Sequence, residues 1–316
     1  MKIVKDITES LSRISRGFYP DQHLDSVLRP KLKYLYERGF VMLDHLVGSE
    51  TIKRVQADIN RKFEQDRDIV YPCLAQSRID AKRDKDLIEN NFLATPDVLK
   101  QRQLTFGRDD IESYDQMIRD FQPSTLTIPM PSSKTYYDLW LDPVVMNLVS
   151  AYMGFVPQLT EAYIRRNFPC TYKVMNHYWH RDTNHADHLL KAFVFFTDCD
   201  ISTGAHHYIA GSVHDERFRD KVYFTDDEIN SVWPIGSENH MISTVPAGTI
   251  IIEDTRGLHK AGSPQRAYRD LGFAVFLPPN NFRKSKSYYS IDDKTFNSLS
   301  YNQKRFISSA NVKGSH

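Results

Sequence analysis

Cysteine is scarce in this chain of 316 residues, which contains only Cys73, Cys170 and Cys199. Three cysteines so far apart fit a reducing compartment better than a disulfide framework, and they lack the paired spacing of a zinc knuckle. Long apolar runs are missing too: none approaches the roughly 18 residues that a membrane helix needs, and the N-terminus lacks the apolar core of a signal peptide. These absences predict a cytoplasmic protein that does not bind a membrane.

Neither sign of charge is in excess. Lysine and arginine number 41 and aspartate and glutamate 40, which gives a net charge of +1. No long-range field would therefore concentrate nucleic acid or an anionic membrane, and a small-molecule partner is expected instead. Hydrophobic residues make up 41% and aromatic residues 12%, which is typical of a globular enzyme with a sizeable core. The sequence does not indicate an oligomeric state.

The N-terminal part, residues 1–157, is predicted to be mainly helical. A helix is expected to begin near Pro30 and to end at Gly39, followed by the short strand FVML and by a second helix that Ser49 caps. One face of this second helix is apolar at helical spacing, through Ile52, Val55, Ile59 and Phe63.

The segment 66–120 is highly charged with few strand signals. It is interpreted as helix and loop, part of which could form a lid. Two further helices are expected to begin near Ser133 and at Asp142-Pro143, and the second should end at Gly154.

From about residue 158 short β-rich runs follow one another, separated by turn residues: TYKVMNHYW, KAFVFFTD, HHYIAG, TIIIED and DLGFAVFLP. Strands without long helices between them predict an antiparallel sandwich or barrel rather than a doubly wound sheet. The fold class is thus mainly β with flanking α-helices. We expect one domain over 1–316, with the β core at 158–280 and a C-terminal extension at 281–316, of which 314–316 resemble the start of an affinity tag.

The stretch HYWHRDTNHADH, residues 177–188, holds two His-x-Asp triplets, and a third occurs at His23/Asp25. Such triplets also arise by chance, so the flanking sequence has to select among them. His180 and Asp182 stand at the end of a predicted strand, where alternation points both side chains to one face. His185/Asp187, with the adjoining His188, fall in the loop that should follow, and His23/Asp25 precedes the first helix.

One histidine and one carboxylate leave a divalent metal short of ligands. The best third ligand is His259, directly after the strand TIIIED. Two histidines and one carboxylate with open positions suit non-haem Fe(II) that also binds a cosubstrate and O2. Arg269 shares a strand face with Leu271 and Phe273, and an arginine on an apolar face is costly unless an anion such as a dicarboxylate meets it.

These segments together resemble the phytanoyl-CoA dioxygenase-like branch of the Fe(II)/2-oxoglutarate oxygenases. The similarity runs from about 36 to 277 through YERGFVMLDHLVGSETIKRVQADI, WHRD, KAFVFFTDCDISTGAHHYIAGSVH, PAGTIIIEDTRGLHKAG and YRDLGF. It implies a double-stranded β-helix (jelly-roll, cupin-like) core with an N-terminal helical region, and Fe(II), 2-oxoglutarate and O2 as cofactor and cosubstrates.

By position, the resemblance places the iron ligands on His180, Asp182 and His259, the arginine for the distal carboxylate of 2-oxoglutarate on Arg269, and a polar 2-oxoglutarate contact on Asn167. It implies hydroxylation of a C–H bond, with release of succinate and CO2; desaturation, cyclisation and epoxidation are open to the same chemistry. Halogenation is disfavoured because halogenases lack the carboxylate that Asp182 supplies.

Two positions depart from the family pattern. The family's Pro-Gly-Ser-His appears as AGSVH at 210–214, which concerns a turn rather than chemistry. A serine often found two residues after the distal histidine is Ala261 here, so a hydrogen bond to 2-oxoglutarate is either missing or supplied by another residue.

The remaining candidates have plainer interpretations. His177 is expected in the core or against the cosubstrate, Arg181 in a salt bridge away from the metal, and His206 and His207 on opposite strand faces. Lys191 begins a core strand, where a buried amine would need an anionic partner; a contact with cosubstrate or substrate is the alternative.

Two other functions are open: a non-catalytic jelly-roll metal-binding protein, and a cupin-type metalloenzyme that does not use 2-oxoglutarate. Arg269 argues against both, and a structural metal site normally closes its coordination sphere. The substrate is expected to be a small, polar metabolite, because the rim of the predicted site carries His185, His188 and Arg181; the family label itself does not identify it.

Overall fold

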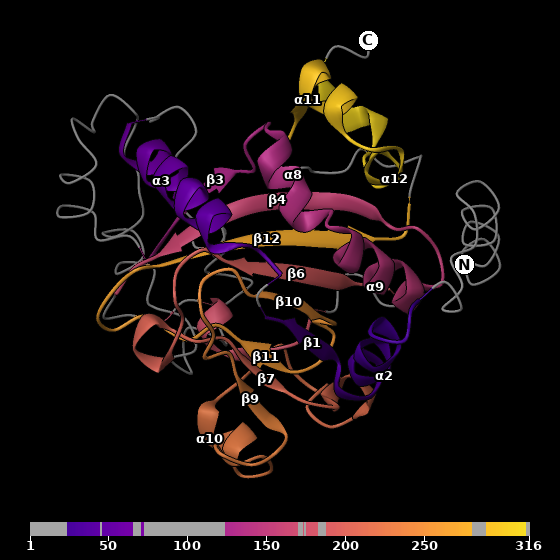
Figure 1. Cartoon of the computed structure of the whole chain (residues 1–316). Helices are drawn as coiled ribbons and strands as arrows, with labels where there is room; N and C mark the ends of the chain where they lie inside the picture. Colours follow the sequence, from indigo (N-terminus) through magenta and orange to yellow (C-terminus); the bar gives the residue numbers. More distant parts are fainter. Residues whose placement is uncertain are drawn as a thin grey trace.

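Two antiparallel β-sheets face each other in the computed structural model of the chain, and helices cover the outer face of the larger sheet (Figure 1). The structure describes residues 24–44, 46–65, 71–72, 124–169, 173, 175–182, 188–279 and 289–313.

The larger sheet has seven strands in the order β1-β10-β6-β12-β4-β3-β2. Their bounds are Phe40–Leu43 (β1), Ile250–Glu253 (β10), Leu190–Phe195 (β6), Arg269–Leu277 (β12), Gln158–Asn167 (β4), Thr125–Pro129 (β3) and Tyr71–Pro72 (β2). The smaller sheet has five strands in the order β8-β5-β11-β7-β9. Their bounds are Tyr223–Phe224 (β8), Trp179–His180 (β5), His259–Lys260 (β11), His207–Ile209 (β7) and His240–Ile242 (β9).

The helices are α2 (Leu28–Arg38), α3 (Ser49–Gln65), α8 (Lys134–Trp140), α9 (Pro143–Met153), α10 (Asp226–Asn230), α11 (Asp293–Ser298) and α12 (Tyr301–Lys304). Short 3₁₀ turns lie at Met175–His177 (η3), Ile201–Thr203 (η4), Ser212–His214 (η5) and Ser309–Asn311 (η6), and β13 (Ile291–Asp292) pairs in parallel with β14 (Val312–Lys313). No helix within these described ranges is both long and apolar enough to cross a membrane.

Local sequence signals account for the helix ends. Gly39 stops α2 in the left-handed conformation, at φ 83°, a region that favours glycine. Asp142 caps α9 by accepting a hydrogen bond from the Val144 amide, Pro143 occupies its first turn, and Gly154 ends it. The buried face of α3 consists of the four residues predicted for it, Ile52, Val55, Ile59 and Phe63. The predicted ends of α2 and α9 and the start of α9 at Asp142-Pro143 are confirmed. Ser49 was predicted to cap α3 but is the first residue of this helix.

Strand alternation divides the core in two. On β6, Ala192 and Val194 face the helices within the largest apolar cluster, whereas Phe193 and Phe195 face the smaller sheet together with Leu271 of β12. One face of β6 thus packs against the helices, and its other face lines the space between the sheets. The candidate site lies in this space between the two sheets.

Two strand predictions were incomplete. The run TYKVMNHYW was predicted as one strand, but Met175–His177 forms a 3₁₀ turn. Among the described residues of the run, only Trp179 belongs to a strand, which it forms with His180. The sequence interpretation also missed β4, whose QLTEAYIRRN carries three charged residues. β4 is nevertheless central, because it pairs with both β12 and β3. The candidate lid, 66–120, lies outside the described residues except for Tyr71–Pro72.

Tyr208 links the N-terminal strand to the loop before β11. Its hydroxyl donates a hydrogen bond of 3.0 Å to the Asp254 carbonyl. A Cβ atom at either Gly39 or Gly257 would overlap with this phenol ring. The ring therefore fits only because both neighbours lack a side chain.

Candidate metal and cosubstrate site

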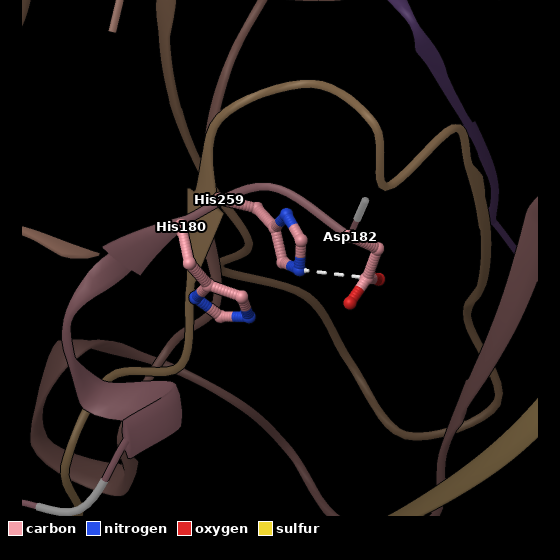
Figure 2. Close-up of side chains that lie close together, drawn as sticks. All are labelled: His180, Asp182 and His259. Carbon is pink, nitrogen blue, oxygen red and sulfur yellow. Dashed lines mark ion pairs between the residues drawn. The ribbon is translucent and has the colours of Figure 1, made fainter. Parts of the chain in front are cut away.

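Three side chains with metal-ligating atoms meet between the sheets (Figure 2). His180 ends β5, Asp182 follows two residues later, and His259 begins β11. The two histidines are directly paired across the antiparallel strands, so their rings lie 4.3 Å apart between centroids. One ligand atom of each residue lies within 4.8 Å of the others. The structure thus brings together the three residues that the sequence selected.

The backbone orients both imidazoles. Nδ1 of His180 lies 2.8 Å from the Tyr178 carbonyl, and Nδ1 of His259 lies 3.0 Å from the Gly257 carbonyl. Because a carbonyl can only accept, each Nδ1 carries the proton and each Nε2 keeps a free lone pair. Burial lowers the pKa of both histidines, which keeps the rings neutral. Neutral imidazole with a fixed second nitrogen is the form that ligates metals.

The carboxylate of Asp182 is held by a lysine from the facing sheet. Nζ of Lys191 on β6 lies 2.5 Å from Oδ2 of Asp182, and Nε2 of His259 lies 3.7 Å from the same oxygen. Burial has the largest single effect on the pKa of Asp182 and raises it, but the charge and hydrogen bond of Lys191 together with His259 and His180 outweigh burial and hold this pKa well below its usual range. The carboxylate is therefore ionised, and Lys191 has the anionic partner that its buried position requires.

Arg269 is the clearest sign that an anion belongs in this site. Its side chain is 1% exposed, and its Nε and Nη1 atoms are buried without a hydrogen-bond partner among the described residues. Burial lowers the pKa of Arg269. Burying a guanidinium without a carboxylate partner costs free energy. One carboxylate of a bound dicarboxylate could accept hydrogen bonds from this guanidinium and offset that cost. These observations, with the histidine lone pairs and the ionised Asp182, fit a divalent metal and an anionic cosubstrate.

Asn167 lies opposite Arg269 in the β4–β12 pairing. Its Oδ1 accepts a hydrogen bond of 3.2 Å from Thr125, and its Nδ2 lies 3.4 Å from the Arg269 carbonyl. The structure therefore places this predicted cosubstrate residue beside the arginine, with its amide engaged by protein groups.

A buried acid–base pair next to the triad was missed by the sequence interpretation. Nε2 of His206 lies 3.0 Å from each carboxylate oxygen of Glu253, whose side chain is fully buried. The His206 ring lies 5.7 Å from the ring of His259. The available signal was a glutamate ending the apolar run TIII on a strand that is otherwise core.

Arg181 departs from its predicted role. It points away from the triad as expected, but it makes no salt bridge within the described chain. Its guanidinium instead donates to five backbone carbonyls, those of Ser212, Asp215, Arg217, Phe218 and Arg256. It thereby fixes the loops next to the site.

The other histidines divide as follows. His177 is buried as predicted, and burial, followed by the charge of Arg269, lowers its pKa to about 3. The ring of His188 packs 5.5 Å from that of Phe155. His23, His185 and Asp187 lie outside the described residues.

Solved structures with the same fold include enzymes described as dependent on alpha-ketoglutarate, another name for 2-oxoglutarate. The non-heme alpha-ketoglutarate-dependent carbocyclase SnoK from nogalamycin biosynthesis has 14% sequence identity and a TM-score of 0.50 over 82% of this chain and 86% of its own. The epimerase SnoN, solved with Fe3+, alpha-ketoglutarate and nogalamycin RO, has the same identity and TM-score over 80% of this chain and 84% of its own. This likeness confirms the predicted jelly-roll fold.

No curated protein matches the sequence. The family model for phytanoyl-CoA dioxygenase (PhyH) matches residues 35–265, a span that includes the triad and ends just before Arg269. The matched span also covers every strand of the smaller sheet. On this match, the chain belongs to the phytanoyl-CoA dioxygenase (PhyH) family of Fe(II)/2-oxoglutarate-dependent oxygenases.

Proposed function

We propose that this oxygenase hydroxylates a C–H bond of a small, polar metabolite. In this proposal His180, Asp182 and His259 bind Fe(II), and Arg269 binds the distal carboxylate of 2-oxoglutarate. The observation that carries the proposal is Arg269, whose buried guanidinium has two nitrogens without a hydrogen-bond partner among the described residues. Arg269 lies on β12 of the larger sheet, whereas His180 and His259 come from the smaller sheet. Neither a structural metal site nor a cupin that does not use 2-oxoglutarate needs this arginine.

Fe(II), 2-oxoglutarate and O2 together supply an oxidant for unactivated C–H bonds and release succinate and CO2. The contribution of the chain is to hold and orient these groups. Nε2 of each histidine and one oxygen of Asp182 would provide three ligands to the metal, and a site with three protein ligands would leave room for cosubstrate and O2. The Tyr178 and Gly257 carbonyls fix the rings, and Lys191 fixes the carboxylate.

The inner face of the larger sheet supports a polar substrate. The rings of Tyr163 and Phe273 stack with centroids 5.0 Å apart, and the guanidinium carbon of Arg165 lies 4.8 Å and 5.0 Å from their centroids. Arg165 is also near enough to Lys191 to affect its pKa. An aromatic surface bordered by two cations favours a compact molecule with polar groups over a free fatty acid.

The test is succinate formation from 2-oxoglutarate in the presence of Fe(II), O2 and a library of polar metabolites. A true substrate should increase succinate release above the background turnover. Its product should contain one oxygen atom from isotopically labelled O2. Product that has lost two hydrogens, or that is rearranged without added oxygen, would replace hydroxylation by desaturation, cyclisation or epimerisation.

The variant Asp182→Ala serves as the matched control, because it removes a proposed ligand without changing the cosubstrate arginine. Coupled oxidation should disappear in this variant. Substrate oxidation that proceeds without added 2-oxoglutarate would favour the cupin-type metalloenzyme. Metal binding without any succinate release in the unchanged protein would favour the non-catalytic metal-binding protein.

A further inference from the structure

The His206–Glu253 pair joins the two sheets directly behind the triad. Glu253 ends β10 in the larger sheet, and His206 directly precedes β7 in the smaller one. Both carboxylate oxygens lie 3.0 Å from Nε2 of His206, and both residues are buried. The Nε2 atom is therefore occupied, whereas Nδ1 has no hydrogen-bond partner among the described residues.

His206 lies close both to the triad and to Arg269. Its ring is 5.7 Å from that of His259 and 5.3 Å from that of Phe193. Arg269 is close enough to lower the pKa of His206, after burial as the main cause, to about 3. A cosubstrate that extends from the metal to Arg269 would therefore run near this imidazole.

The strand register gives a second reason to expect His206 to contact the cosubstrate. His259 pairs with Tyr208 and Lys260 pairs with His207, and the amide of Gly262 donates to the Ala205 carbonyl at 2.9 Å. The same register sets His206 opposite Ala261. Cross-strand neighbours place their side chains on one face roughly 5 Å apart. Ala261 offers no polar group there, and the imidazole of His206 can provide one.

We infer that His206, held by Glu253, is a further binding residue for the distal carboxylate of 2-oxoglutarate, acting beside Arg269. This inference rests on the proposed function. His206 is the group that touches the cosubstrate through Nδ1–H, and Glu253 is a positioning residue that fixes the ring through Nε2. Burial raises the pKa of Glu253 well above its usual range, so the pair is neutral and leaves the positive charge of Arg269 for the anion.

The experiment compares two keto acids that chelate iron through the same atoms. 2-Oxoglutarate carries the distal carboxylate, and 2-oxopentanoate lacks it. Each is titrated without O2 into the Fe(II)-loaded protein, and the metal-to-ligand charge-transfer band gives the Kd. In His206→Leu the Kd for 2-oxoglutarate should rise on the order of tenfold, as for a lost hydrogen bond to a charged group. The Kd for 2-oxopentanoate should stay nearly constant.

Three further variants sharpen the result. His206→Gln keeps a donor and should restore part of the affinity. His207→Leu changes the neighbouring histidine on the opposite strand face and should bind both keto acids like the unchanged protein. The paired variant His206→Leu/Glu253→Leu removes both partners, so no buried polar group is left unpaired and folding should be retained; it should show the same selective loss as His206→Leu.

The inference is overturned if the paired variant or His206→Leu keeps the original Kd for 2-oxoglutarate, or if the affinities for both keto acids fall equally, which would indicate a structural role. These outcomes leave the proposed function intact. A different outcome, no charge-transfer band in the unchanged protein with Fe(II) and 2-oxoglutarate, overturns the proposed function and this inference together.

Discussion

Replacing Arg269 by leucine should have opposite effects on the protein without and with its cosubstrate. Without ligand, the guanidinium is 1% exposed, and its Nε and Nη1 atoms have no hydrogen-bond partner in the described part of the chain. Exchanging such a buried charge for an apolar side chain of similar width is expected to stabilise the free protein, by about 1–4 kcal/mol. The substitution is thus expected to raise the melting temperature of the metal-free, ligand-free protein.

With 2-oxoglutarate present, the unchanged protein should instead be more stable than Arg269→Leu. Loss of a buried charge-assisted pair costs roughly 2–5 kcal/mol of binding free energy, which at 1.4 kcal/mol per tenfold corresponds to a Kd increase of roughly 30-fold to several thousandfold. A concentration 100 times the original Kd stabilises the unchanged protein by about 2.7 kcal/mol. The same concentration should hardly stabilise Arg269→Leu.

The assay is thermal unfolding under anaerobic conditions with Fe(II) and increasing 2-oxoglutarate, together with a titration of iron alone. Iron affinity should change little, because Arg269 is not a proposed ligand. Arg269→Lys is the matched control: it keeps the charge but not the two-pronged geometry, and should lose less affinity than leucine. An unaltered 2-oxoglutarate titration, or a free protein destabilised by several kcal/mol, would refute the reasoning.

Three other substitutions test the site and its support. His259→Ala should abolish the charge-transfer band of the Fe(II)–2-oxoglutarate complex, and a full band in this variant would remove the residue from the triad. The paired change His185→Ala/Asp187→Ala should leave one Fe(II) per chain by metal analysis; loss of that iron would mean that the wrong His-x-Asp triplet was chosen. Asp270→Asn should lower the free energy of unfolding in urea by about 3–5 kcal/mol, because Arg166, whose Nη2 lies 2.6 Å from Asp270, would lose its buried partner; an unchanged unfolding midpoint would contradict this.

Helix ends and faces were predictable because their causes are local. The apolar spacing of α3 and the Asp142-Pro143 start of α9 need only a few adjacent residues to act. β4 was missed because its stability comes from two neighbouring strands that are distant in sequence. The charged residues of β4 mask its strand pattern in the sequence, although its outer face packs in the apolar core through residues such as Ile164.

In the candidate site too, features with local causes were predictable, and those that depend on residues distant in sequence were not. His180 and Asp182 could be selected because strand alternation relates residues two apart, and Arg269 because an arginine on an apolar face is unusual. Glu253 could not be assigned a partner from sequence, since His206 lies 47 residues away on the other sheet. Lys191 was expected to need an anion, but only the fold shows that this anion is Asp182.

The phenol of Tyr208 has a consequence for how this sequence can diverge. Its ring occupies the space that a Cβ would need at Gly39 and at Gly257, two positions far apart in the chain. Substitutions at these three sites are therefore epistatic: Gly257→Ala should be tolerated only after Tyr208 has become smaller. Gly39 has the additional constraint of its left-handed backbone, so it should remain glycine in either background. A combinatorial library selected for folding should recover the changes at 208 and 257 in that order and not in the reverse one.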